Sequence, residues 1–183
     1  MKMHYHEQRE QHFTGKSNTT ADQKDLWQTP KALFHTLDQE FDFDADICAS
    51  KNNNLKGTYF NEEKSALTNE WDKYSVYKSA FMNPPYSQTE LFLNRAAEQA
   101  KKHNITVVAL VNANTDTKWF AECAKSSNEI RLISGRVGFI SSTGGKSNGN
   151  TKGQCLIIWR GKCETPCQIT MVSRDKLMKQ SKN

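Results

Sequence analysis

The run Asn83-Pro84-Pro85-Tyr86 combines side chains suited to handling a planar amino group. Two prolines fix the backbone and carry no N–H, so their carbonyls stay free to accept hydrogen bonds. The Asn83 amide oxygen and the Pro84 carbonyl then offer two acceptors for the two hydrogens of one amine, and Tyr86 offers a ring for stacking. Acceptors that draw on those hydrogens favour the pyramidal nitrogen needed in a transition state.

The same run also suits a purely structural role, in which the prolines stiffen the end of a strand and the tyrosine packs beside it. Its surroundings favour binding, because an apolar strand pattern at 76–82 precedes it and a helix pattern at 89–102 follows it. Ligands of open α/β sheets bind beyond the carboxyl ends of the strands. The run therefore predicts a site for the exocyclic amine of a base or for an amide nitrogen.

Strand patterns alternate with helix patterns along the chain, which predicts an α/β sheet with right-handed crossovers. Apolar residues recur at helical spacing over 30–40, 89–102 and 117–125, and strand patterns cover 41–46, 58–60, 76–82, 105–111, 130–133 and 155–159. We divide the chain into a flexible N-terminal arm (1–24), a folded domain (25–161) and a basic C-terminal tail (162–183).

Charge is spread unevenly over the 183 residues, whose net charge is +5. Residues 38–72 hold nine acidic and three basic residues, whereas residues 118–183 hold twelve basic and four acidic ones. A basic C-terminal third suits a polyanionic partner such as nucleic acid, although a solvated basic surface is an equal alternative. The sequence shows neither a membrane-spanning apolar run nor a signal peptide, so we expect a soluble intracellular protein.

The five cysteines form an odd and scattered set, which indicates reduced thiols rather than a disulfide framework. Cys163 and Cys167 have a spacing that a metal could use, but no second pair completes a tetrahedral set. His35 and His103 are interpreted as solvated residues at helix ends. We therefore expect no metal site.

An ordered series of motifs, over about residues 26–159, resembles the phage-type DNA N-6-adenine methyltransferases. Residues 83–87 are similar to the Asp/Asn-Pro-Pro-Tyr/Phe motif of S-adenosylmethionine-dependent amino-methyltransferases, which act on adenine N6, cytosine N4 or a protein glutamine amide. The rest of the series is Trp27-Gln28-Thr29-Pro30, Asp46-Ile47-Cys48-Ala49-Ser50, Ala66-Leu67 with Trp71, Trp119-Phe120, and Gly135-Arg136 with Phe139. The ordered series is more specific than the short motif alone.

The resemblance implies a class I methyltransferase-like Rossmann sandwich, in which a mostly parallel sheet of seven strands has an antiparallel last strand. It also implies transfer of a methyl group from S-adenosyl-L-methionine to the exocyclic amine of a flipped adenine in double-stranded DNA. We expect no membrane association, no obligatory protein partner, and a cytoplasmic location in a bacterial host whose phage or prophage encodes the protein. A cytosine-N4 enzyme, a glutamine-amide enzyme and an inactive DNA-binding relative stay open as alternatives.

By the same resemblance, Asn83, Pro84, Pro85 and Tyr86 face the target amine, while Trp27, Thr29, Pro30, Asp46, Cys48 and Ala49 hold the methionine end of the cofactor. The chain departs from the usual pattern, because no Gly-rich loop follows the first strand. Only 36 residues separate Asp46 from Asn83, which leaves no room for a target-recognition domain between them.

Contacts to DNA must then come from elsewhere. We expect them from Arg136, from Phe139 as a second stacking ring, and from the loop 141–153, whose Lys146 and Lys152 suit phosphates. The alternative is a solvated hairpin loop with Phe139 in the core.

Overall fold

The computed structural model describes residues 25–71, 78–141, 152–162 and 164–179. The predicted N-terminal arm, 1–24, and Lys146 lie outside the described residues. No helix in the described part of the chain is both long and apolar enough to cross a membrane.

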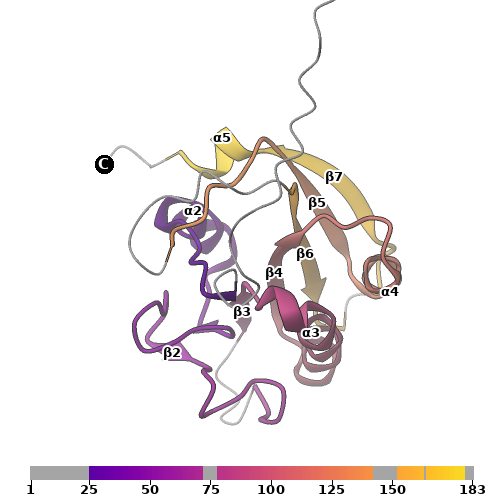
Figure 1. Ribbon diagram of the computed structural model, residues 1–183. Helices are drawn as coiled ribbons and strands as arrows, with labels where there is room; N and C mark the ends of the chain where they lie inside the picture. Colours follow the sequence, from indigo (N-terminus) through magenta and orange to yellow (C-terminus); the bar gives the residue numbers. More distant parts are fainter. Residues whose placement is uncertain (1–24, 72–77, 142–151, 163, 180–183) are drawn as a thin grey trace, which may run out of the picture.

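A seven-stranded sheet forms the centre of the molecule, with the strand order β2-β1-β3-β4-β6-β5-β7 (Figure 1). Strand β6 pairs antiparallel with both of its neighbours, β4 and β5, and every other pair of neighbouring strands is parallel. The strands are β1 (Ala45–Asp46), β2 (Thr58–Tyr59), β3 (Ser79–Met82), β4 (Thr106–Asn112), β5 (Glu129–Ser134), β6 (Gln154–Arg160) and β7 (Gln168–Ser173). The predicted mixed α/β class is confirmed, and the antiparallel strand is the sixth along the chain rather than the last.

Helices cover both faces of this sheet (Figure 1). The side chains of the central strands alternate: Ala80 and Met82 belong to the apolar cluster under α3 and α4, whereas Phe81 belongs to the cluster under α2 and α5. The helices are α2 (Lys31–Phe41), α3 (Thr89–His103), α4 (Lys118–Ser126) and the short α5 (Arg174–Leu177). The central strands β3, β4 and β6 are therefore buried on both sides, as their apolar sequences require.

The predicted helices agree with α2, α3 and α4 to within one residue at each end. The predicted strand at 41–46 is mostly wrong, because α2 continues to Phe41 and only Ala45 and Asp46 are strand. Asp42 ends the helix in the left-handed conformation, and the Asp38 carboxylate accepts a hydrogen bond from the Phe43 N–H at 2.9 Å. A helix end followed by a turn thus mimics the alternation of a strand.

The sheet continues into the segment for which the sequence predicts a basic tail. Strand β7 pairs with β5 along its whole length, and Leu177 of α5 is buried in the α2-side cluster. Ile169 and Met171 of β7 are exposed at the edge of the sheet, so the strand lacks the burial pattern that marks an inner strand. The folded chain therefore extends beyond residue 161.

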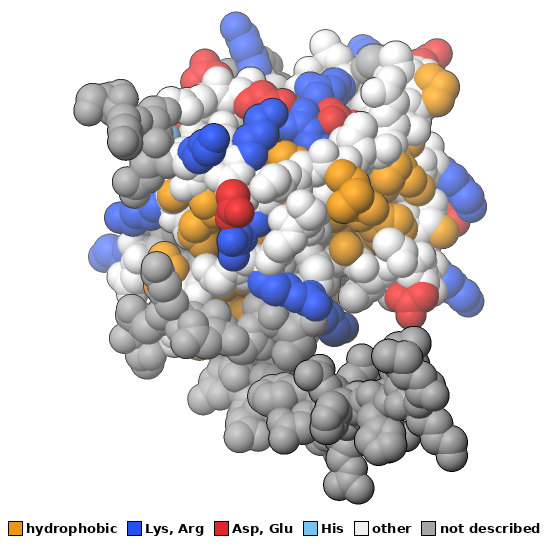
Figure 2. Space-filling model, turned by 90° about the horizontal axis from the view of Figure 1, so that it is seen from above, with side chains coloured by type: hydrophobic (Ala, Val, Ile, Leu, Met, Phe, Trp, Pro, Cys, Tyr) orange, Lys and Arg blue, Asp and Glu red, His pale blue; other side chains and the backbone are white. Residues whose placement is uncertain are grey.

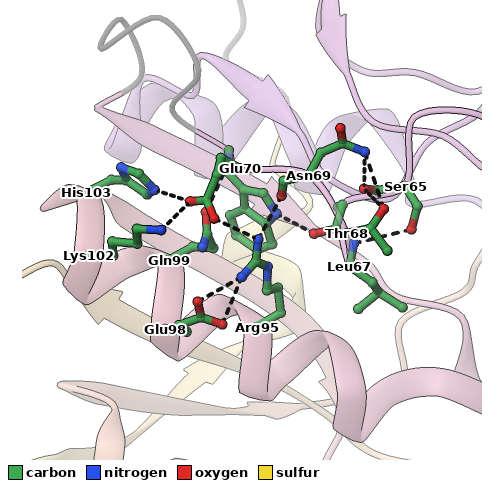
Figure 3. A network of polar contacts seen from close by, with 12 residues as sticks. Ser65, Leu67, Thr68, Asn69, Glu70, Arg95, Glu98, Gln99, Lys102 and His103 are labelled. Carbon is green, nitrogen blue, oxygen red and sulfur yellow. Dashed lines mark hydrogen bonds and ion pairs between the residues drawn. The ribbon is translucent and has the colours of Figure 1, made fainter.

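A polar network joins the segment after β2 to α3 (Figure 3). The Glu70 carboxylate contacts His103 at 2.7 Å and Lys102 at 3.0 Å, and Arg95 donates to the Asn69 carbonyl. Beneath it, the buried Trp71 donates its backbone N–H to Gln99. These contacts fix residues 69–71 against α3, the helix that follows the turn at Asn83.

Candidate active site

A cavity of about 510 Å³ lies at the carboxyl ends of β1, β2 and β3. Four segments line it: residues 25–29 before α2, the loops that follow β1 and β2, and the turn at 83–88 after β3. Because the three strands are parallel, their ends meet at the same edge of the sheet. Of the expected cofactor residues, the lining includes Trp27, Thr29, Asp46, Cys48 and Ala49; of the expected amine-binding residues, it includes Asn83 and Pro85.

Asn83 is half-buried at the point where the buried strand β3 ends. Its amide nitrogen donates to the Trp27 carbonyl at 3.5 Å, which leaves the amide oxygen as the acceptor available to a bound group. Pro84 is buried beneath the turn, and Pro85 precedes the short helix η1 (Tyr86–Gln88). The structure thus places the asparagine amide at the cavity wall.

Tyr86 lies beside the cavity rather than in its lining. Its ring and that of Trp27 form a T-shaped pair, with the centroids 6.1 Å apart and the two planes at 85°. Burial and the nearby Asp25 carboxylate raise the pKa of Tyr86 to about 12. The phenol is therefore neutral at pH 7 and serves as an aromatic surface or a hydrogen-bond donor, not as a base.

Asp46 occupies the end of β1 and is almost fully buried. Its carboxylate accepts from the backbone N–H of Cys48 at 3.3 Å and of Leu55 at 3.1 Å, so it closes the loop after β1. Burial raises the pKa of Asp46 to about 6, and these two hydrogen bonds lower it in part. Burial, and then the Asp46 charge, also raise the pKa of the Cys48 thiol, which keeps it protonated and unsuited to nucleophilic attack.

The remaining expected cofactor residues lie close by. Thr29 and Pro30 are buried at the start of α2, and Ala49 donates its N–H to the Phe60 carbonyl at 3.0 Å, which ties the loops after β1 and β2 together. Sequence reasoning missed Asn61, Glu62 and Glu63, although their position directly after β2 is the signal that could have found them.

Sequence reasoning also missed Asp25 and Ser87. The Asp25 carboxylate accepts from the Ser87 hydroxyl at 2.6 Å and from the Ser87 N–H at 3.2 Å. Nothing local in the sequence indicates this pair, because the two residues come together only through the fold.

The structure does not bring Phe139 to the cavity. Its side chain is only 1% exposed, and Trp27 is stacked on it at 6.3 Å between centroids, with the planes at 20°. This position fits the alternative that places Phe139 in the core.

Arg136 follows the end of β5, and Lys152 precedes the start of β6; both are exposed. Because β5 is parallel to β3 and β4, and β6 is antiparallel to them, both residues lie at the same edge of the sheet as Asn83. A Cβ atom built on Gly153, next to Lys152, would lie 3.9 Å from a guanidinium nitrogen of Arg136. The Arg136 carbonyl also accepts from Arg174 at 3.4 Å. Figure 2, which looks onto the end of the molecule that carries α5, shows Lys and Arg side chains spread over this face.

The comparisons with known proteins all match the same protein family. The family model described as DNA N-6-adenine-methyltransferase (Dam) matches residues 16–183. The chain is 39% identical over 151 residues to the DNA N-6-adenine-methyltransferase of Haemophilus phage HP1 (strain HP1c1), covering 80% of this chain and 85% of that relative. It is 32% identical over 171 residues to the DNA N-6-adenine-methyltransferase of Escherichia phage T1, covering 84% of this chain and 70% of that relative.

Proposed function

This chain belongs to the DNA N-6-adenine-methyltransferase (Dam) family, and we propose that the cavity beside Asn83 is where it brings S-adenosylmethionine and a flipped adenine of double-stranded DNA together. The reaction is methylation of adenine N6 in DNA. The observation that carries the assignment of the site is the Asn83 amide, which is anchored through its nitrogen and presents its oxygen at the cavity wall. We propose that residues 25–179 form the methyltransferase domain.

The cavity fits the cofactor in size and in charge. Its volume of about 510 Å³ lies within the range usual for pockets that enclose a small organic ligand. The cofactor supplies a methyl group bonded to a positively charged sulfur. The positive charges of its sulfonium and ammonium groups suit the buried Asp46 and the exposed Glu62 and Glu63. Its carboxylate suits the exposed Lys51.

The proposed cofactor residues follow from this fit. Thr29, Asp46, Cys48 and Ala49 line the part of the cavity between α2 and β1, and Pro30 fixes the start of α2 behind Thr29. We assign the methionine end of the cofactor to this part, which leaves the side next to Asn83 for the base.

The protein's own groups then orient the adenine. The Asn83 oxygen and the Pro84 carbonyl accept the two N6 hydrogens, which favours a pyramidal nitrogen whose lone pair points at the methyl carbon. The neutral thiol of Cys48 and the neutral phenol of Tyr86 supply no base at pH 7. We assign the rate to positioning and to exclusion of water, and the proton that N6 must lose would pass to solvent after methylation.

The DNA itself is held by charge. Extrusion of a base from a duplex costs a few kcal/mol, which contacts to the flanking backbone must offset. Arg136 and Lys152, at the same sheet edge as the cavity, are the described residues that we assign to phosphates.

Transfer of tritiated methyl groups to unmethylated plasmid DNA tests the proposal, with the labelled nucleoside identified by chromatography. Wild type should label N6-methyladenine, and Asn83→Ala should lose turnover while it keeps cofactor affinity. Asn94→Ala, the same substitution at an exposed position of α3, should behave as wild type. A wild-type rate in Asn83→Ala would contradict the assigned role, and label in N4-methylcytosine would redirect the proposal to the other base.

A further inference from the structure

Trp27 lies between two aromatic residues that the chain supplies from distant segments. Its indole meets Tyr86 edge to face at 6.1 Å and lies almost parallel to Phe139 at 6.3 Å. Phe139 is buried, whereas Trp27 is half-buried and lines the cavity. Phe139 thus supports one face of the indole, while the indole itself borders the space into which a ligand fits.

The backbone around Trp27 is held on both sides. Gln28 and Ile140 exchange two backbone hydrogen bonds, at 2.8 and 2.9 Å. On the other side, Asp25 binds Ser87 and the Trp27 carbonyl accepts from the Asn83 amide. The indole is therefore fixed next to the group that accepts the target amine.

We propose that Trp27 is the surface on which the target adenine stacks while its N6 faces Asn83. The inference rests on the proposed function and changes the role of one residue, since the family resemblance assigns Trp27 to the cofactor. Its aromatic and polar contacts are to Tyr86, Phe139 and Asn83, whereas the proposed cofactor residues surround Asp46. Phe139, covered by the indole, supports the stack from behind instead of touching the base.

The role predicts a specific pattern of kinetics. Truncation of an aromatic ring to a non-aromatic side chain weakens binding of the base stacked on it roughly 5- to 150-fold. Trp27→Leu should lower the single-turnover methylation rate by about that factor and leave the cofactor Kd within about twofold of wild type. Trp27→Phe keeps a ring and should recover most of the rate, and both variants keep the backbone carbonyl that Asn83 contacts.

The experiment begins by mapping the methylated adenines in plasmid DNA treated with wild-type protein. An oligonucleotide duplex with that site is then used with S-adenosylmethionine in single-turnover reactions, and cofactor Kd is measured by calorimetry. A second duplex carries an abasic site opposite the target adenine, which makes extrusion easier and should recover part of the rate of Trp27→Leu. Phe41→Leu removes a half-buried ring at the C-terminal end of α2, away from the cavity, and as the control it should stay near the wild-type rate.

Each other outcome overturns the inference. A wild-type rate in Trp27→Leu, no recovery in Trp27→Phe, or a loss of cofactor affinity as large as the loss of rate would assign Trp27 elsewhere. Should thermal unfolding show that Trp27→Leu does not fold, Trp27→Met places an unbranched, adaptable side chain without a ring in the space and carries the same expectation. A wild-type protein that methylates no adenine would instead defeat the proposed function, which separates the two failures.

Discussion

The carboxylate of Asp25 and the hydroxyl of Ser87 lie 2.6 Å apart although the two residues are 62 positions apart in the sequence. Their hydrogen bond joins the segment that carries Trp27 to the turn that carries Asn83 and Tyr86. A second contact between the same residues, from the Ser87 N–H, makes the Asp25 carboxylate a two-point anchor. The two walls of the proposed base site are therefore fixed to each other by a contact between two residues that themselves line the cavity.

Ser87→Ala should lower the methylation rate without weakening cofactor binding. Loss of one hydrogen bond at an exposed position removes about 1 kcal/mol of positioning free energy, which corresponds to a rate roughly fivefold lower. Steady-state kinetics with saturating cofactor would measure it. Ser173→Ala removes an exposed serine that caps α5, and it should leave the rate unchanged. Equal rates for the two variants would mean that the Asp25–Ser87 contact does not position the site.

The sequence predicts those parts of the fold whose burial is regular. Strand β4 is identified because it is a continuous run of buried apolar residues. Helix α3 is identified because Phe92, Leu93, Ala96 and Ala100 recur at helical spacing and are buried. Strand β7 escapes prediction because five of its six residues are exposed, and its place in the sheet depends on hydrogen bonds to β5. A strand that joins the edge of a sheet mainly through backbone hydrogen bonds leaves no pattern of apolar residues in its own sequence.

The candidate site can likewise be predicted from the sequence only in part. The run at Asn83 is recognisable because proline restricts the backbone wherever it occurs, so its chemistry can be inferred from adjacent residues. The stack of Trp27 on Phe139 and the anchor of Asp25 on Ser87 join segments far apart in the chain. Distances of that kind follow only from the packed structure, and they change the role assigned to Phe139.

Cofactor affinity should rise with pH up to about pH 6 and then level off. The pKa of Asp46 is raised to about 6 in the free protein, so the carboxyl group is protonated below that pH. A bound cation favours the carboxylate, so binding releases a proton below pH 6, and affinity gains roughly tenfold between pH 5 and pH 7. Calorimetric titration with S-adenosylmethionine across this range measures the gain.

Asp46→Asn should bind the cofactor more weakly at pH 7 and show no such pH dependence. Asp116→Asn, the same substitution at an exposed aspartate, should keep the wild-type profile. If the wild-type affinity were flat between pH 5 and pH 7, Asp46 would not face the cofactor's charge.

The free energy of unfolding should depend on the negative charge of Glu70 at pH 7 but not near pH 2. Hydrogen bonds from His103 and then Lys102 hold the pKa of Glu70 at about 2, below its ordinary value of 4.5 (Figure 3). A lowered carboxyl pKa stabilises the fold fully above the ordinary value, and the stabilisation is lost as the pH falls from 4.5 toward 2. Glu70→Gln should therefore lower the urea midpoint at pH 7 and approach the wild-type midpoint near pH 2.

Glu122→Gln is the matched control for this measurement, because Glu122 pairs only with Lys125 one turn along α4 among the described ion pairs. Its midpoint should stay close to that of wild type at both pH values. A constant gap between Glu70→Gln and wild type down to pH 2 would show that the effect comes from packing rather than from charge.

Arg136 and Lys152 should control how strongly DNA binding depends on salt. Each phosphate neutralised on a duplex contributes about 0.9 to the slope of log K against log salt concentration, because binding releases condensed counterions. Arg136→Gln and Lys152→Gln should each reduce that slope by about 0.9, and the double variant by about 1.8, with cofactor affinity unchanged. Fluorescence anisotropy with a labelled duplex at several salt concentrations gives the slopes.

Lys125→Gln makes the same charge change at the far end of α4, where Lys125 pairs with Glu122. Its slope should equal that of wild type, because the C-terminal end of α4 leads into β5 and lies at the edge of the sheet opposite the cavity. Slopes that fall equally for all three variants would indicate diffuse attraction by the net charge of the chain. A fall confined to Arg136→Gln and Lys152→Gln would place the phosphates at the rim where β5 ends and β6 begins, on the edge of the sheet that also carries Asn83.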